Sequence, residues 1–339
     1  MRVVVVGATG NIGTSLIEAL GADPGVTSVL GLARRRPDWS PPKTEWATAD
    51  VRTAELAPHF RGADVVVHLA WVFQPTHDAV ATWRVNVGGS LRVFAAVAAA
   101  GVPALVYSSS VAAYSPGPQR PQDRPVDESW PTHGWPGAAY GREKAYVERV
   151  LDTFDRDHPD VRVVRIRPAF IFKRDSAQQQ RQLFIGPLVP RRLLRPGLLP
   201  YAPDIPGLRF QALHGVDAGD AFRRAVRSDV RGALNIAADP VVDAAVLAEL
   251  LDAKPVRLPA WAVRSALAVG WSLRLVPASP GLFDAFLRLP VLDVGRARAE
   301  LGWSATRSSV DALRDFLDGL RDAAGAPTPP LADRASRAG

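Results

Sequence analysis

Three glycines near the start of the chain constrain its fold more than any other feature. They directly follow the β-branched run Val3–Val6 and directly precede a segment with helical periodicity at residues 11–21. This order of strand, turn and helix is typical of dinucleotide binding, because glycine lets the backbone approach a pyrophosphate and the helix N-terminus offers free N–H groups. A tight turn without a ligand is the alternative. The residues expected to contact the cofactor here are Gly7, Thr9, Gly10, Asn11, Ile12 and Gly13.

Strand-like and helix-like segments alternate through the first half of the chain. Apolar runs typical of buried strands recur at 28–33, 46–49, 63–69, 104–108 and 161–167, and helical patterns at 82–100 and 138–157. This alternation predicts an α/β fold, a Rossmann-type doubly wound parallel sheet with ligands at the C-terminal ends of its strands. Further cofactor contacts are therefore expected just after strands, at Asp50, Val51, Leu69, Ala70, Pro168, Ala169 and Phe170.

The pattern changes after residue 170. We expect strands at 210–214 and 233–237 and helices at 217–227, 243–252, 260–275 and 308–321. They divide the chain into an NAD(P)-binding Rossmann domain (1–171 plus 210–239), a smaller C-terminal substrate-binding lobe (172–209 plus 240–322) and a disordered Pro/Ala-rich tail (323–339). Helix 260–275 is apolar almost all round. Burial in the core is the default expectation, with an apolar substrate pocket or a membrane surface as alternatives.

Composition narrows the classes of function. The chain has no cysteine, which excludes disulfides and thiolate catalysis and fits a cytoplasmic location. Its six histidines are scattered, so no metal site is expected, and no apolar run reaches the roughly 18 residues of a membrane span. The net charge of +7 comes from arginines interleaved with acids. We therefore expect an anionic small molecule as the partner and no nucleic acid.

The end of the second predicted strand bears on the type of nicotinamide cofactor. A carboxylate at this position would accept hydrogen bonds from the adenosine ribose and repel a 2′-phosphate. The chain has Arg34, Arg35 and Arg36 instead. Because a guanidinium pairs with phosphate, Arg34 and Arg35 favour NADP over NAD. Two alternatives stay open: the cofactor is NAD, or these arginines form only a solvated basic loop. Asp50 would accept from the adenine amino group.

Tyr140 and Lys144 are the candidate reactive pair. Their spacing of four places a phenol and an ammonium on one face of the predicted helix. A tyrosine that exchanges protons near neutral pH needs a pKa about three units below its usual value of about 10. An ammonium about 4 Å away supplies roughly the 4 kcal/mol that this requires at an effective dielectric constant of 20. The oxidised nicotinamide adds positive charge, so we expect Lys144 together with the cofactor to lower the pKa of Tyr140.

The chain resembles the extended short-chain dehydrogenases/reductases, the NAD-dependent epimerase/dehydratase group, over about residues 1–320. The motifs that carry the resemblance are Gly7–Gly13, His68-Leu69-Ala70, Asn86 with Gly89, Ser108–Ser110, Tyr140 with Lys144, Arg167-Pro168, His214 with Asp217, and Leu301-Gly302-Trp303. The resemblance implies that Ser110, Tyr140 and Lys144 are catalytic, that Tyr140 and Lys144 also contact the cofactor, and that helices 82–100 and 138–157 form a homodimer.

One departure from the family affects the substrate. Sugar-nucleotide epimerases usually carry an Arg-x-Gly-Asp element where this chain has residues 283–289 (FDAFLRL). The candidate substrate contacts are Trp71, Ser110, Trp135 and Arg174. Three functions follow: an NAD(P)-dependent oxidoreductase acting on a carbonyl or secondary alcohol, a sugar-nucleotide epimerase or dehydratase that recycles NAD, and a non-catalytic regulator that senses NADP. The first is the leading interpretation.

Overall fold

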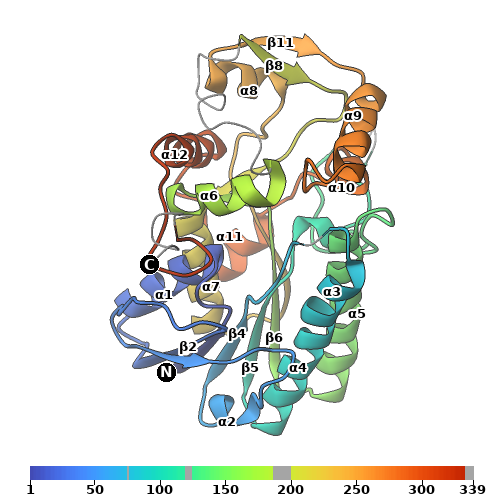
Figure 1. The fold of residues 1–339 in the computed structure, drawn as a ribbon. Helices are drawn as coiled ribbons and strands as arrows, with labels where there is room; N and C mark the ends of the chain where they lie inside the picture. Colours follow the sequence, from blue (N-terminus) through green and yellow to red (C-terminus); the bar gives the residue numbers. More distant parts are fainter. Residues whose placement is uncertain (75, 119–123, 186–199, 333–339) are drawn as a thin grey trace.

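A seven-stranded parallel sheet forms the lower part of the molecule in Figure 1. The structure is a computed structural model that describes residues 1–332 except 75, 119–123 and 186–199. The strand order is β10-β6-β5-β4-β1-β2-β3, which confirms the predicted Rossmann-type sheet. The strands are β1 (Arg2–Val6), β2 (Ser28–Ala33), β3 (Thr44–Thr48), β4 (Val65–His68), β5 (Ala104–Ser108), β6 (Arg162–Pro168) and β10 (Gly232–Ile236).

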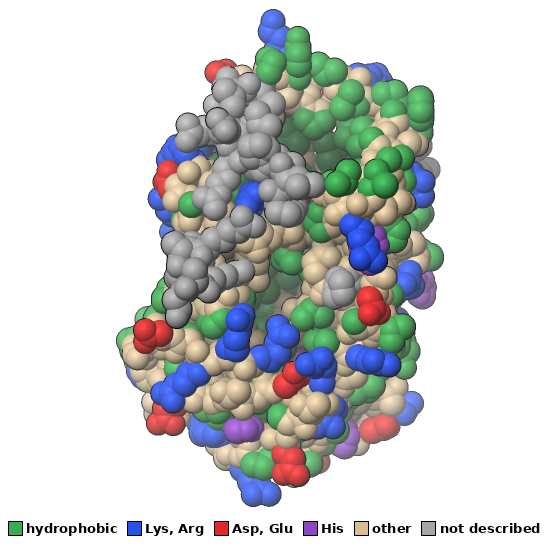
Figure 2. Space-filling model, viewed as in Figure 1, with side chains coloured by type: hydrophobic (Ala, Val, Ile, Leu, Met, Phe, Trp, Pro, Cys, Tyr) green, Lys and Arg blue, Asp and Glu red, His purple; other side chains and the backbone are tan. Residues whose placement is uncertain are grey.

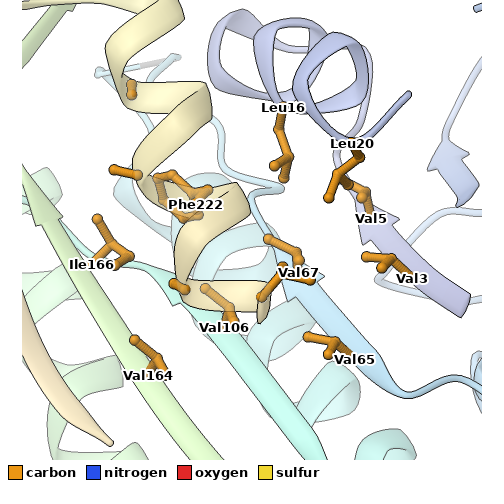
Figure 3. Packing of buried hydrophobic residues seen from close by; sticks show 14 of the residues in the cluster. Val3, Val5, Leu16, Leu20, Val65, Val67, Val106, Val164, Ile166 and Phe222 are labelled. Atoms are coloured by element: carbon orange, nitrogen blue, oxygen red, sulfur yellow. The ribbon is translucent and has the colours of Figure 1, made fainter. Parts of the chain in front are cut away.

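Helices cover both faces of the sheet because successive residues of a strand point to opposite sides. Val3 and Val5 pack with Leu16, Leu20 and Phe222 under one pair of helices (Figure 3), whereas Val4 and Val6 belong to the core on the other face. The first face carries α1 (Asn11–Ala22) and α7 (Gly215–Arg227), and the second carries α2 (Ala57–Phe60), α4 (Gly89–Ala99) and α5 (Ala139–Asp157). Two buried cores therefore fix the sheet from both sides.

The helix predicted at 82–100 is interrupted. It begins as α3 (Ala79–Trp83), widens into a π-helical turn (Arg84–Gly88) and continues as α4. The turn contains Asn86, whose side chain both accepts from the Val72 backbone N–H and donates to the Val72 carbonyl. A side chain that binds a neighbouring segment at a π-turn explains the break in helical geometry.

A second lobe lies above the sheet in Figure 1. It contains two small parallel pairs, β7 (Phe170–Phe172) with β9 (Ala212–His214) and β8 (Tyr201–Asp204) with β11 (Lys254–Arg257). Its helices are α6 (Ala177–Gln180), α8 (Ala244–Leu251), α9 (Ala260–Ser272), α10 (Pro280–Phe286) and α12 (Ser309–Arg321), while α11 (Gly295–Leu301) packs beside β10. The strands β7, β8 and β11 and the helices α6, α10 and α11 had no periodic signal in the sequence, because they are short.

The default expectation for helix 260–275 is wrong. No residue of α9 is buried, although the helix is apolar almost all round. Trp271 on α9 donates a hydrogen bond from Nε1 to Thr76 Oγ1 and stacks on the ring of His77. The helix therefore lies on the surface of the lobe, with one side against the loop after β4 and the other facing outward.

The expected disordered tail is also wrong for residues 323–332. Thr328 and Leu331 are each 1% exposed, and Thr328 Oγ1 donates to the backbone carbonyl of Thr9 in the glycine turn. This segment folds back onto the cofactor end of the sheet, whereas residues 333–339 lie outside the described residues. The proposed domain boundaries stay a prediction. Among the described helices none is long and apolar enough to cross a membrane.

Candidate active site

The glycine turn between β1 and α1 has the geometry that a pyrophosphate requires. Gly7 has φ of 87°, and a Cβ there would lie 2.6 Å from the Ala70 backbone nitrogen, so no other residue fits. A Cβ at Gly13 would lie 2.5 Å from the Gly7 carbonyl oxygen. Helix α1 has no side-chain cap, and Asn11 Oδ1 is a buried atom without a hydrogen-bond partner. The first turn of α1 thus offers polar groups to an anion, and the residues present fit a dinucleotide.

The other predicted cofactor contacts lie along the same edge of the sheet. Asp50 and Val51 follow β3, Leu69 and Ala70 follow β4, and Pro168–Phe170 end β6. Because all these strands are parallel and in register, their C-terminal ends meet beside Gly7. Arg34 and Arg35 are exposed directly after β2. Asp50 accepts a bidentate pair from Arg52, which holds the pKa of that carboxyl below its usual range.

Tyr140 and Ser110 meet at the end of β5. A hydrogen bond joins the two hydroxyl groups, and Ser110 Oγ also accepts from the Ala112 backbone N–H. Tyr140 belongs to the first turn of α5 and lies among aromatic rings, with centroids 4.9 Å away at Phe73 and 6.0 Å away at Trp71. The structure therefore brings together the serine and the phenol that the sequence singled out.

Lys144, which was expected to acidify the tyrosine, binds the backbone at the end of β5. Its Nζ donates to the Ser108 carbonyl at 2.7 Å, lies 3.5 Å from the centroid of the Trp71 ring, and is 6.0 Å from the centroid of the Tyr140 ring. Lys144 itself is 3% exposed. The hydrogen bond to Ser108 thus fixes the Lys144 ammonium at the end of β5.

In the chain without cofactor, the pKa of Tyr140 is raised from its ordinary value, and the lowering expected from Lys144 together with the nicotinamide stays a prediction. Loss of solvent around the hydroxyl raises the pKa of Tyr140, the hydrogen bond with Ser110 lowers it, and the nearby Glu143 raises it further. Burial likewise drives the pKa of Lys144 well below its ordinary value, against the opposing effect of Glu148 and Glu143. The phenol is thus held in its neutral form when the chain is alone.

A cavity of about 150 Å³ opens beside Tyr140. Its large apolar lining residues are Val72, Phe73, Trp271 and Leu282, and the charged Arg142 and Glu143 also line it. Trp271 comes from α9, so one residue of helix 260–275 lines this cavity, and its use as a substrate pocket stays a prediction. The volume is below the roughly 300–1,000 Å³ of sites that enclose a whole ligand. The cavity therefore has room for only part of a ligand of ordinary size.

The sequence analysis missed Glu143, which also lines this cavity. Its carboxylate is 2% exposed and accepts from Thr82 Oγ1 and Asn86 Nδ2, each at 2.6 Å. Burial raises the pKa of Glu143, and the two hydrogen bonds lower it. The available signal was its position three residues after Tyr140, which places both side chains on one face of a helix.

A comparison with family models decides the classification of this chain. The model of the NAD dependent epimerase/dehydratase family matches residues 3–189, from β1 through the glycine turn and the Tyr140 helix. The chain belongs to this family. The sequence-based resemblance is thereby confirmed, and an NAD-dependent enzyme of the extended short-chain dehydrogenase/reductase type follows from it.

Proteins that are similar to this chain are named for different reactions. L-arabinose 1-dehydrogenase (NAD(P)(+)) of Haloferax volcanii is 29% identical over 53% of this chain and 70% of its own length. N-acetyl-alpha-D-glucosaminyl-diphospho-ditrans,octacis-undecaprenol 4-epimerase of Escherichia coli O157:H7 is 32% identical over 50% of this chain and 49% of its own. UDP-glucose 4-epimerase of Thermus thermophilus, solved with NAD, has a TM-score of 0.70 at 22% identity, covering 95% of this chain and 100% of its own, and supports the fold.

Two predicted substrate contacts of this family member have other partners. The Trp135 ring lies 4.5 Å from the guanidinium carbon of Arg288, and Trp135 is not among the residues that line the Tyr140 cavity. Arg174 forms a 2.6 Å ion pair with Asp322, and its backbone N–H donates to Asp315 on α12. Trp71, the third candidate, contacts both Lys144 and Tyr140. Among the described residues, no group of three acidic, histidine or cysteine side chains could hold a metal ion.

Proposed function

We propose that the chain is an NAD(P)-dependent oxidoreductase that transfers hydride between a nicotinamide and a carbonyl or secondary alcohol. One observation carries this proposal. The phenol of Tyr140 lines a cavity and is hydrogen-bonded to Ser110, and its ring contacts Trp71. Trp71 directly follows Ala70, whose backbone lies against Gly7 of the glycine turn. A proton-exchanging hydroxyl beside a dinucleotide cradle is the arrangement that hydride transfer to a carbonyl needs.

Different residues of the chain would bind the cofactor, position the substrate and exchange the proton. The glycine turn and the start of α1 would hold the pyrophosphate, and Lys144 would bind the nicotinamide ribose. The nicotinamide supplies or accepts the hydride when it is bound. Ser110 Oγ donates to the substrate oxygen and fixes its position, while Tyr140 Oη exchanges a proton with that oxygen. The raised pKa keeps Tyr140 protonated, which is the form that gives a proton to a carbonyl oxygen and favours reduction.

For the cofactor we propose NADP. Arg34 and Arg35 follow β2 directly, where NAD-binding sheets of this type carry an acidic residue, and both are exposed at the cofactor edge. A 2′-phosphate placed there would gain charge-assisted hydrogen bonds. The matched test compares dinucleotide dissociation constants for wild type, Arg34→Ala/Arg35→Ala and a control Arg298→Ala on α11. NADP binding should weaken at least about tenfold in the double variant and should not change in Arg298→Ala. NAD binding should be the same in all three proteins. Tighter NAD than NADP binding in wild type would overturn this part.

The reaction is tested with a panel of aldehydes, ketones and aldoses, followed by nicotinamide absorbance. Tyr140→Phe should lower kcat by about 10²- to 10⁴-fold, since it removes the proton donor. The dissociation constant of the dinucleotide should change little, because the phenyl ring keeps its contacts with Phe73 and Trp71. Full activity in Tyr140→Phe would rule out the proposed role.

A sugar-nucleotide 4-epimerase that recycles NAD is the second candidate. The family and the two epimerases above favour it, whereas the sequence FDAFLRL at 283–289, partly within α10, replaces the usual Arg-x-Gly-Asp element. Incubation with UDP-sugars separates the two functions. Interconversion of epimers without net change of cofactor would support the epimerase, and net oxidation or reduction would support the oxidoreductase.

A further inference from the structure

The chain from residue 323 to residue 332 connects the second lobe to the glycine turn. At its start the Ala324 N–H donates to the Gly319 carbonyl of α12, and in Figure 1 the segment runs from α12 down toward α1. Thr328 is buried, and its Oγ1 donates a 3.0 Å hydrogen bond to the Thr9 carbonyl. We call this segment the strap, because it contacts both parts of the molecule.

Internal hydrogen bonds give the strap a fixed shape. The N–H groups of Leu331 and Ala332 donate to the Thr328 carbonyl at 2.9 and 2.8 Å, and the Ala326 N–H donates to the Leu331 carbonyl at 3.1 Å. Leu331 is buried and supplies an apolar anchor. The backbone on both sides of Thr328 is therefore held, and the Thr328 hydroxyl stays directed at the glycine turn.

The hydrogen bond from Thr328 fixes the peptide that leads into α1. This peptide joins Thr9 to Gly10, the N-cap of α1, and its N–H donates to the Gly7 carbonyl at 3.1 Å. Its carbonyl and its N–H point in opposite directions because the bond is trans, so Thr328 holds one side and Gly7 the other. The two hydrogen bonds thus set the direction of the first N–H groups of α1, which are the groups offered to a pyrophosphate.

The ligand expected at the glycine turn is anionic, and the surface agrees with this. In Figure 2 the molecule is hollowed between the second lobe and the sheet, and Lys and Arg side chains gather along the lower border of the hollow. A dinucleotide bound in a Rossmann-type sheet brings its pyrophosphate to the start of the first helix. The strap holds the backbone at this place.

We propose that the strap keeps the glycine turn in its phosphate-binding form, and that Thr328 is the positioning residue through which it acts. This inference rests on the proposed function, since it requires a dinucleotide in the turn. Without the Thr328 hydroxyl, the buried Thr9 carbonyl would lose this donor. The turn would then be less well ordered before the ligand arrives, and binding would have to order it at a cost in affinity.

The test measures the dissociation constants of NADPH and NADH by fluorescence, for the full-length wild type and three variants. Thr328→Val removes the hydroxyl at nearly constant volume and should weaken the binding of both dinucleotides by about three- to tenfold. Thr328→Ser keeps the hydroxyl and should bind like wild type. The control Thr27→Val removes a hydroxyl that also donates to a backbone carbonyl at 3.0 Å, that of Met1 at the opposite end of β1, and should bind like wild type.

Thermal unfolding without dinucleotide separates a positioning role from a structural one. If Thr328→Val unfolds at a lower temperature but keeps both wild-type dissociation constants, the strap only stabilises the fold and the proposal is overturned. A loss of affinity that Thr328→Ser shares would also overturn it, because the hydroxyl would not be the cause.

The two dinucleotides distinguish the strap from the arginines after β2. Both carry the same pyrophosphate, so Thr328→Val should weaken them by the same factor, and weakening of NADPH alone would overturn a role through the pyrophosphate. A wild type that binds neither dinucleotide would overturn the proposed function together with the strap. Binding that depends on Thr328 without any turnover would support the strap and overturn only the proposed reaction.

Discussion

The indole of Trp71 lies directly on the ammonium group of Lys144, with Nζ 3.5 Å from the ring centroid. Lys144 is buried, and desolvation drives its pKa well below its ordinary value. A π-face over a desolvated ammonium favours the charged form and opposes this effect. Trp71 thus connects the loop after β4 to α5 and stabilises the charged form of Lys144.

Replacing Trp71 with leucine should therefore make Lys144 lose its proton at lower pH. The alkaline limb of the pH profile of kcat/KM should move toward lower pH by about 0.4–1.5 units, because a cation–π contact contributes roughly 0.5–2 kcal/mol. Trp71→Phe keeps a ring over the ammonium and should show a smaller shift. An alkaline limb that is identical in the leucine and phenylalanine variants would contradict this role.

A second prediction concerns the pair Glu143 and Asn86. The Glu143 carboxylate accepts from Asn86 Nδ2, and Asn86 in turn binds both backbone groups of Val72, next to Trp71 and Phe73. Glu143→Gln replaces one carboxylate oxygen, which accepts a hydrogen bond, with an amide N–H₂, which donates. This change should lower the free energy of unfolding by about 1–3 kcal/mol. A double-mutant cycle with Asn86→Ala, read by urea unfolding, should give a coupling of at least about 0.5 kcal/mol. Additive effects would show that the contact has no positioning role.

Tyr140 and Lys144 illustrate what the sequence could and could not predict. The β-branched runs and the glycine turn identified the sheet, since these patterns follow from local chemistry. The i, i+4 spacing placed Tyr140 and Lys144 on one helix face, but the direction of the Lys144 ammonium depends on the distant Ser108 carbonyl and Trp71 ring. Likewise, the apolar pattern of α9 suggests burial, whereas burial requires a partner surface elsewhere in the fold. Tertiary contacts decide both cases.

His68 provides a prediction about acid stability. Burial, and secondarily the charge of Lys144, lowers the pKa of His68 from 6.5 to about 3. A histidine whose folded pKa is depressed contributes stability above its unfolded pKa of 6.5, and this contribution is lost as the pH falls toward 3. Between pH 7.5 and pH 5 the loss from His68 should be about 2 kcal/mol.

Urea unfolding at these two pH values, for wild type and His68→Leu, checks the prediction. The variant should be less stable overall at neutral pH but should lose about 2 kcal/mol less than wild type on acidification. His133→Leu is the control, because His133 is exposed and its replacement should leave the pH dependence unchanged. If His68→Leu and wild type lose equal stability, His68 does not take up a proton on unfolding in this range.

The last prediction concerns the homodimer expected through the helices at 82–100 and 138–157. Three large side chains on this side of the molecule are exposed: Trp83 at 41%, Leu91 at 43% and Tyr146 at 45%. The rings of Trp83 and Tyr146 lie 4.8 Å apart, so α3 and α5 share one apolar surface.

Gel filtration with light scattering should find a dimer for wild type. Leu91→Glu/Tyr146→Glu should raise the dissociation constant at least about 100-fold, because two carboxylates would be buried in each half of the interface. Trp261→Ser/Val269→Ser, which changes two exposed side chains of α9, should remain dimeric. A monomeric wild type, or a glutamate variant that stays dimeric, would show that these helices do not form the interface.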